Sequence, residues 1–330
     1  MPPGLLREPP PGLQARHRRS AAVSAVRVGT RGSALALAQT TALAERFAGE
    51  VEIVGITTQG DVDRGSLAQI GGTGVFTSAL RDALLRDEVD VIVHSMKDLP
   101  TAPHEGIALA AVARREDARD ALCARDGLGF DDLPEGAKVG TGSPRRAAQL
   151  RRVRPDLEVV DIRGNIETRL ARAQGADADL DAVVLALAGL TRLGMQDAAT
   201  EVLGLGRFPT APAQGALAVE AREGDAAAMR AVARTDHVVT RACVDAERLV
   251  LAGLEAGCSA PIAATAIVDD GMLFLSATVY ALDGSRHLTA SHAYTLDGQS
   301  SAELSQAAMD VAGRAVRELV DAGAMELDAS

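Results

Sequence analysis

Arginine side chains recur at the predicted turns where a buried strand runs into a helix. A guanidinium group matches a carboxylate in two-point geometry, and a helix N-terminus adds free amides and a dipole that favour anions. A solvated helix face would explain any one of these arginines, but a set that recurs at the same kind of turn indicates a site for a ligand with carboxylates. The set comprises Arg31, Arg145, Arg146, Arg163, Arg169 and Arg192.

The turn at residues 140–146 is the strongest of these anion sites in sequence terms. Ser143 is a typical helix cap, Pro144 suits the first helical position, and two arginines follow directly. Ser33 is expected to cap the earlier helix in the same way, after a strand at residues 26–28. The two segments, 28–33 and 139–143, both read as strand, Gly-Thr turn, Ser cap and helix, which suggests two similarly built α/β units.

Lys97 and Asp98 stand at the end of a predicted apolar strand, residues 89–93. Open α/β sheets bind their ligands at such strand ends. The pair is either a surface ion pair of little energetic value or a general acid/base beside a cation, and the residues alone leave both interpretations open. His94, just before them, is expected to be a satisfied turn histidine, because the six histidines lack the spacing of a zinc site.

Cys258 follows a predicted helix at residues 236–256 and precedes Ser259-Ala260-Pro261, in a tight connection. A cysteine in an exposed loop can act as a nucleophile or a covalent anchor. Cys123 and Cys243 lie in strand-like and helical patterns and are expected to be buried. Three cysteines without close pairing fit a reducing cytoplasm better than a disulfide scaffold.

Composition narrows the functional classes. The net charge of −11 and the 2% of aromatic residues argue against a nucleic-acid binder, which needs basic surface and stacking platforms. No apolar run approaches the roughly 18 residues of a membrane span. Residues 1–24 lack an apolar signal core, so export is not expected, and we interpret them as a disordered tail or the result of a start codon placed too far upstream.

The C-terminal part of the chain predicts a small antiparallel sheet. Three strand-like runs, at 262–268, 272–281 and 287–296, are separated by Asp270-Gly271 and Asp283-Gly284, which are good hairpin turns. A helix at 302–322 closes the chain. In the N-terminal part, residues 61–74 are Gly-rich and without periodicity, so a long surface loop is expected there.

Five segments together resemble the hydroxymethylbilane synthase (porphobilinogen deaminase) family, in that family's order and at about its spacing. The resemblance extends from about residue 26 to the C-terminus. The segments are residues 29–39, 94–100, 140–146, 163–170 and 257–262.

The resemblance implies an α/β fold of three domains. Two are like the α/β domains of type II periplasmic binding proteins, with a cleft between them, and the third is a small α+β domain with a three-stranded antiparallel sheet. On this basis we expect domain 1 at 25–114 and 213–233, domain 2 at 115–212 and domain 3 at 234–330.

The resemblance also implies a reaction. Four porphobilinogen molecules condense, with loss of ammonia, to the linear tetrapyrrole hydroxymethylbilane, in porphyrin and heme biosynthesis. Cys258 would hold a dipyrromethane cofactor through a thioether. Porphobilinogen loses ammonia to give an azafulvene, so one carboxyl group, Asp98, would protonate the leaving amine and remove the α-proton. A cytoplasmic monomer without metal, nucleic acid or membrane is implied.

The growing product accumulates carboxylates, because every pyrrole carries an acetate and a propionate. The arginines answer that need. By match to the motifs, the residues that bind cofactor and substrate would be Arg31, Ser33, Ser95, Lys97, Thr141, Ser143, Arg145, Arg146, Arg163, Arg169 and Arg192.

The sequence departs from the family's motifs in three places, and three alternative functions compete with this interpretation. Thr73 and Ser78, in the lid-like stretch 71–80, stand where the family usually has lysines, so the resemblance does not supply those substrate contacts. Residues 211–215 follow their motif only loosely, and Gly142 and Pro144 are atypical within theirs. A binding module for small carboxylated ligands would not need Cys258. A nucleic-acid binder conflicts with the charge, and a catalytically lapsed paralogue conflicts with the presence of both Asp98 and Cys258.

Overall fold

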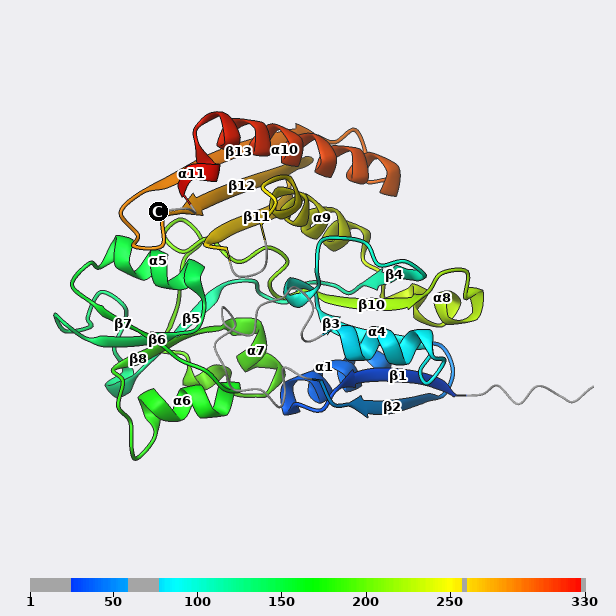
Figure 1. The fold of residues 1–330 in the computed structure, drawn as a ribbon, viewed down its shortest axis with the longest axis horizontal. Helices are drawn as coiled ribbons and strands as arrows, with labels where there is room; N and C mark the ends of the chain where they lie inside the picture. Colours follow the sequence, from blue (N-terminus) through cyan, green and yellow to red (C-terminus); the bar gives the residue numbers. More distant parts are fainter. Residues whose placement is uncertain (1–24, 59–76, 257–259, 328–330) are drawn as a thin grey trace, which may run out of the picture.

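Three β-sheets organise the chain in a computed structural model that describes residues 25–58, 77–256 and 260–327 (Figure 1). Two sheets are five-stranded and mixed, and the third is three-stranded and antiparallel. The expected fold class, two α/β units and a small α+β unit, is confirmed. The exact residues at which one domain gives way to the next stay a prediction.

The first sheet has the strand order β2-β1-β3-β10-β4. Strands β1, β2 and β3 are parallel, and β10 runs antiparallel to both of its neighbours. Its strands are β1 (Val26–Arg31), β2 (Val51–Ile56), β3 (Val91–Ser95), β4 (Ile107–Val112) and β10 (Leu217–Arg222). Its helices are α1 (Ala34–Ala44), α4 (Ser78–Leu85) and α8 (Ala226–Val232).

The second sheet has the order β7-β6-β8-β5-β9, with β5 antiparallel to both of its neighbours. Its strands are β5 (Asp120–Ala124), β6 (Lys138–Thr141), β7 (Glu158–Asp161), β8 (Ala182–Ala186) and β9 (Glu201–Val202). Its helices are α5 (Pro144–Val153), α6 (Ile166–Gln174) and α7 (Leu187–Arg192).

The two five-stranded sheets repeat one arrangement, because in each the first strand of the unit's parallel set lies between the second and the third. The predicted similarity of the segments around β1 and β6 is therefore confirmed. Gly29 and Gly140 hold matching places in these strands. A Cβ on Gly29 would lie 2.9 Å from Ile92 Cγ2, and one on Gly140 would lie 2.6 Å from Leu180 Cδ1, so only glycine leaves room for the neighbouring side chains.

The third unit packs two helices against its antiparallel sheet. Both predicted hairpin turns are present: Asp270 and Gly271 adopt positive φ between β11 and β12, and Gly284 does so between β12 and β13. The strands are β11 (Ile262–Asp269), β12 (Met272–Tyr280) and β13 (His287–Thr295). The helices are α9 (Val238–Gly253), α10 (Ser301–Asp321) and the short α11 (Ala324–Leu327).

The chain crosses between the two larger sheets twice, and the two crossings are bonded to each other. The outward crossing joins β4 to β5, and the return crossing joins β9 to β10. Arg115 Nε donates to Gln214 O at 2.8 Å, and Glu116 N donates to Gly215 O at 3.2 Å. Gly215 has a φ of +87°, and a Cβ there would lie 2.7 Å from Glu116 O, so the pairing requires glycine.

Glu247 of α9 ties these crossings to the third unit. Its fully buried carboxylate accepts two hydrogen bonds from Arg115, at 2.6 and 3.0 Å. It also accepts from Ala213 N and from Ala266 N, both at 2.6 Å. One side chain thus contacts both crossings and β11, and every donor around it is paired.

The structure corrects several expected boundaries. Strand β4, the two-residue β9 and helix α11 were not predicted. His94 lies within β3 and not in the turn after it, so its expected position is wrong; its Nε2 is 3.1 Å from Glu220 Oε2. The loop expected at residues 61–74 lies outside the described residues. None of the helices in the described part of the chain combines the length and apolar character of a membrane span.

The first prediction concerns Glu247. We expect Glu247→Ala to lower the free energy of unfolding by roughly 3–5 kcal/mol, because Arg115 then stays largely buried, with 13% of its side chain exposed, without its counter-charge. Urea denaturation followed by circular dichroism measures the loss. Asp131→Ala is the matched control, because it breaks an ion pair at the surface, in which Asp131 is 70% and Arg207 is 48% exposed. This variant should leave the midpoint nearly unchanged. Equal midpoints for the two variants would contradict this account.

Candidate active site

The turn after β3 carries Lys97 and Asp98 in a short 3-10 helix, η1 (Met96–Asp98). Met96 is fully buried and anchors the turn, and its amide donates to Ala216 O at 3.0 Å in the return crossing. Lys97 and Asp98 are only partly buried. The apolar anchor therefore fixes the backbone while the two charged side chains stay accessible.

Arg248 of α9 holds the same turn from the third unit. Its Nη1 donates to Leu99 O and its Nη2 donates to Pro100 O, both at 2.6 Å. These carbonyls directly follow Asp98 in the chain. The helix that contacts both interdomain crossings through Glu247 therefore also fixes, one residue later, the segment on which Asp98 stands.

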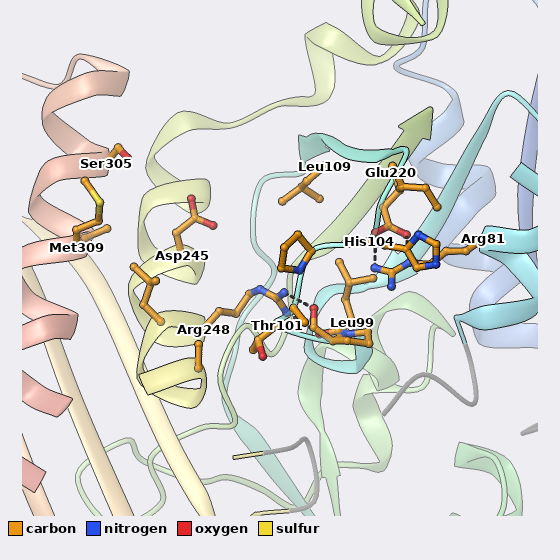
Figure 2. A pocket seen from close by; sticks show the side chains of 17 residues that line it. Arg81, Leu99, Thr101, His104, Leu109, Glu220, Asp245, Arg248, Ser305 and Met309 are labelled. Carbon is orange, nitrogen blue, oxygen red and sulfur yellow. Dashed lines mark hydrogen bonds and ion pairs between the residues drawn. The ribbon is translucent and has the colours of Figure 1, made fainter. Parts of the chain in front are cut away.

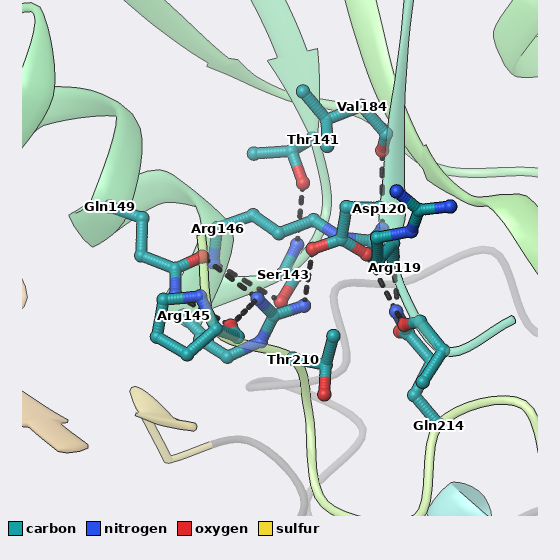
Figure 3. A network of polar contacts seen from close by, with 12 residues as sticks. Arg119, Asp120, Thr141, Ser143, Arg145, Arg146, Gln149, Val184, Thr210 and Gln214 are labelled. Carbon is teal, nitrogen blue, oxygen red and sulfur yellow. Dashed lines mark hydrogen bonds and ion pairs between the residues drawn. The ribbon is translucent and has the colours of Figure 1, made fainter. Parts of the chain in front are cut away.

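A buried carboxylate in the second unit, Asp120 of β5, organises two of the predicted arginines (Figure 3). It accepts from Arg145 Nη2 at 2.9 Å, from Arg146 Nη2 at 2.7 Å and from Gln214 Nε2 at 2.7 Å. Burial alone would raise the pKa of Asp120, but the two guanidinium charges outweigh burial and hold that pKa well below its usual range. Asp120 therefore stays ionised and lets two like charges lie side by side.

Arg145 and Arg146 donate hydrogen bonds to different groups of the protein. Arg145 is 2% exposed, and its Nη1 donates to Gln149 Oε1 and to Pro209 O, both at 2.8 Å. Arg146 donates to Val184 O at 3.2 Å. Within the described residues, the buried Nε atom of each arginine has no hydrogen-bond partner. Arg145 is thus committed mainly to protein contacts, which the sequence did not indicate.

Lys97 shows that the two α/β units meet here. Burial lowers the pKa of Lys97 to about 8. Asp98 acts against that change, and the charges of Arg146 and Arg145 reinforce it. Lys97 follows β3 of the first sheet, whereas both arginines lie in α5 of the second, so the ends of the two sheets face each other at this point.

The electrostatic surroundings of Arg169, in α6 of the second unit, also show that the two α/β units meet here. Burial lowers its pKa, and the charges of Arg146 and Arg163 lower it further. Asp161 and Asp98 act in the opposite direction. Asp98 therefore lies within electrostatic reach of a cation from each α/β unit. We call these cations the basic group: Lys97, Arg145, Arg146, Arg163 and Arg169.

The basic group carries more positive charge than the carboxylates near it neutralise. The carboxylates that act on it are Asp98, Asp120 and Asp161. Arg163 contacts Asp161 at 3.4 Å, and Arg169 Nε donates to Gly164 O at 2.8 Å. A partly buried excess of cations is unfavourable unless an anion balances it, so this junction is suited to a ligand with several carboxylates.

The predicted hydroxyl residues lie at the same ends of the sheets. Ser33 and Ser143 cap α1 and α5, accepting from Ala36 N at 3.3 Å and Arg146 N at 3.4 Å, which confirms both predicted caps. Thr141 Oγ1 accepts from Ser143 N at 3.2 Å. Arg31 and Ser95 end β1 and β3, which are parallel neighbours, so both lie at the sheet end that carries Asp98.

Arg192 differs from the other predicted arginines in its position. It is the last residue of α7 and not part of a strand-to-helix turn, so that part of the expectation is wrong. Its Nη2 donates to Gly215 O at 2.6 Å, in the return crossing. Burial lowers its pKa, and Glu116 acts against that change. Arg169, one turn into α6, also lies beyond its predicted turn.

The three cysteines separate into two groups. Cys123 and Cys243 are buried, as predicted, and burial raises the pKa of each thiol to about 12. Cys258 and Thr73 lie outside the described residues. Ser78, the other position where a family lysine is missing, is the first residue of α4.

Sequence reasoning missed Asp120, Gln214, Glu247 and Arg248. Asp120 gave one signal, a lone carboxylate at the start of an apolar run, and buried carboxylates need a cationic partner. Glu247 and Arg248 lie in helix α9, most of whose other residues are apolar. The partners of all four lie far away in the sequence, so no local pattern could identify those partners.

Comparisons with known proteins agree along most of the chain. The family model for "Porphobilinogen deaminase, dipyromethane cofactor binding domain" matches residues 26–230, and "Porphobilinogen deaminase, C-terminal domain" matches residues 241–310. A porphobilinogen deaminase of Leifsonia xyli subsp. xyli is 60% identical, over 92% of this chain and 94% of its own length. One of Thermobifida fusca is 52% identical, over 91% and 95%.

Solved structures give weaker matches. A TRAP periplasmic solute-binding protein from Bordetella bronchispeptica is 14% identical and covers 64% of this chain and 77% of its own, with a TM-score of 0.35. A score of that size supports no conclusion about the present chain.

Proposed function

The chain belongs to the porphobilinogen deaminase family, and we propose that Asp98 moves the protons of its reaction while the basic group binds carboxylates. The activity is that of a hydroxymethylbilane synthase, a transferase of porphyrin biosynthesis that condenses porphobilinogen units, and the cofactor is dipyrromethane. The observation that carries the residue assignment is the excess of positive charge that both α/β units gather around Asp98.

The described residues fit a dipyrromethane cofactor. Two pyrroles, each with an acetate and a propionate, make a polyanion, and its carboxylates would balance the excess positive charge of the basic group. The buried Nε atoms of Arg146 and Arg163 lack partners among the described residues. Lys97, Arg146, Arg163 and Arg169 would hold the carboxylates. When bound, the cofactor supplies the pyrrole α-carbon to which the first porphobilinogen is joined.

Asp98 has two tasks in the condensation. Its carboxyl group donates a proton to the amine nitrogen of porphobilinogen, so that the carbon–nitrogen bond breaks and ammonia leaves. After the new carbon–carbon bond has formed, the Asp98 carboxylate accepts the proton that the attacking α-carbon loses. One side chain therefore returns to its starting state in every cycle, and no second acid or base is needed.

The surrounding residues position these groups. Asp120 orients Arg146 toward Lys97 across the junction, and Arg248 fixes the carbonyls after Asp98. We assign the remaining predicted binding residues to the carboxylates of later pyrrole units. These residues are Arg31, Ser33, Ser95, Thr141 and Ser143, at the same sheet ends, and Arg192, at the end of α7.

We propose Cys258 as the attachment point of the cofactor. The other two cysteines are buried, and burial suppresses formation of their thiolates, which are the reactive form. Cys258 stands between α9 and β11, in the chain segment that follows Glu247 and Arg248. A cytoplasmic location, a monomeric state and independence from nucleic acid, metal and membrane stay predictions.

The second prediction concerns Asp98. We expect Asp98→Asn to reduce kcat by roughly 10²–10⁴-fold, the usual contribution of a general acid/base. Ammonia release measures kcat, and intact mass confirms that the variant carries its cofactor. Asp161→Asn is the matched control, because Asp161 is a carboxylate of the same junction whose side chain is 60% exposed, and its effect should be far smaller. Near-normal ammonia release by Asp98→Asn would remove Asp98 from the mechanism.

The third prediction follows from the pKa of Lys97. Below about pH 8 Lys97 is charged and can bind a carboxylate, and as the pH rises above that value the charge is lost. We expect kcat/KM for porphobilinogen to fall on the alkaline side, with an apparent pKa at or above about 8. Carboxylates of the cofactor that lie beside Lys97 would raise the pKa of Lys97. In Lys97→Arg the charge persists, so this fall should move to higher pH. An unchanged alkaline limb would show that another group titrates.

The fourth prediction concerns Cys258. Intact mass spectrometry of protein made by cells with ample substrate should show one added dipyrromethane, and peptide mapping should locate it on Cys258. Cys258→Ser should lack the added mass, whereas Cys243→Ala, which removes a buried thiol, should keep it. An unmodified Cys258 in active protein would overturn the assignment.

A further inference from the structure

A pocket that none of the basic group lines lies between the first sheet and the helices of the third unit. Its volume is about 380 Å³, within the range of small-molecule sites. The segment after Asp98, strand β4, and helices α9 and α10 all contribute walls. Its lining includes Leu99, Leu109, Asp245, Arg248, Leu249 and Met309 (Figure 2).

The arginines that line this pocket are already engaged. Arg81 donates to both carboxylate oxygens of Glu220, at 3.0 and 2.6 Å. Arg248 donates to the carbonyls of the turn after Asp98, as described above. Both guanidinium groups are therefore already oriented by acceptors of the protein itself.

Asp245 of α9 is in the opposite situation. It is partly buried, and within the described residues its carboxylate accepts no hydrogen bond and forms no ion pair. Burial raises its pKa, and the more distant charges of Arg241 and Arg248 only partly offset that change. Because this partly buried carboxylate has no partner among the described residues, the unpaired charge that the pocket offers to a ligand is negative.

The rest of the pocket is suited to an apolar body. Figure 2 shows Asp245 between Met309 of α10 on one side and Leu109 of β4 on the other. Leu249 and Met309 are 38% and 51% exposed although both are large and apolar. Apolar side chains that remain exposed around a pocket gain free energy when a ligand covers them.

We propose that this pocket binds a compact organic ammonium ion, whose charge pairs with Asp245 and whose apolar body packs against Leu249 and Met309. This pocket differs from the reaction site in position and in charge. The reaction site is positively charged and must bind the carboxylates of the substrate and the cofactor, whereas this pocket offers a carboxylate. The ligand adjoins the turn that follows Asp98 and contacts α9, so it bridges the first sheet and the third unit.

Three probes with the same ring but different charge test this proposal. Benzylammonium, benzyl alcohol and benzoate are titrated into the cofactor-loaded enzyme, and saturation-transfer NMR measures their affinities. We expect benzylammonium to bind at least about ten-fold more tightly than either of the others, because a charge-assisted pair contributes more than the ring alone. Tighter binding of benzoate, or equal binding of all three, would overturn the proposal.

Two variants locate the binding. Asp245→Asn keeps the shape of the side chain and should weaken benzylammonium about ten-fold or more while leaving benzyl alcohol unchanged. Ala252→Phe fills the pocket from an exposed position of α9 and should abolish binding of benzylammonium. Unchanged affinity in both variants would place the amine elsewhere. Neither residue belongs to the reaction site, so ammonia release should remain normal, and the binding result stands whether or not the assignment of Asp98 holds.

Discussion

The geometry of the reaction site depends on the buried contact between Asp120 and two adjacent arginines. Two guanidinium groups on one turn of α5 repel each other, and in a buried place that repulsion is poorly screened. The carboxylate of Asp120 lies between them and accepts from both, at 2.9 and 2.7 Å. With Arg146 fixed in this way, its charge reaches Lys97 and Arg169, and an excess of positive charge forms at the junction of the two sheets.

Helix α9 extends this order to the third unit. Neighbouring residues on a helix point in directions about 100° apart, so Glu247 and Arg248 serve different partners. Glu247 holds both crossings between the larger sheets, and Arg248 holds the turn after Asp98. The unit whose sequence contains Cys258 therefore takes part directly in placing Asp98, the residue proposed to transfer protons. Val244 of the same helix packs in a buried cluster with Met96, Val112 and Ala218, so a change at this helix would also disturb the core of the first unit.

Sequence patterns predicted the third unit well and the first less completely. The Asp270-Gly271 turn marks the boundary between two strand-like runs, so the prediction of β11 and β12 was close. Strand β4 was missed because Ile107–Val112 is rich in alanine, which favours no strand by itself. His94 was expected in a turn because it is polar, but Glu220 on the neighbouring strand accommodates it inside β3.

The sequence by itself determined which chemistry was available: Asp98 beside Lys97 at a strand end, arginines near helix starts, and the serine caps that made their anion sites recognisable. These are local properties, set by the order of a few residues along the chain. Only the tertiary structure decided that Asp98 would face Arg169, that Asp120 would hold Arg146, and that Asp245 would be left without a partner. Those outcomes depend on residues tens of positions apart, which meet only when the sheets and helices pack and the chain has crossed between the units.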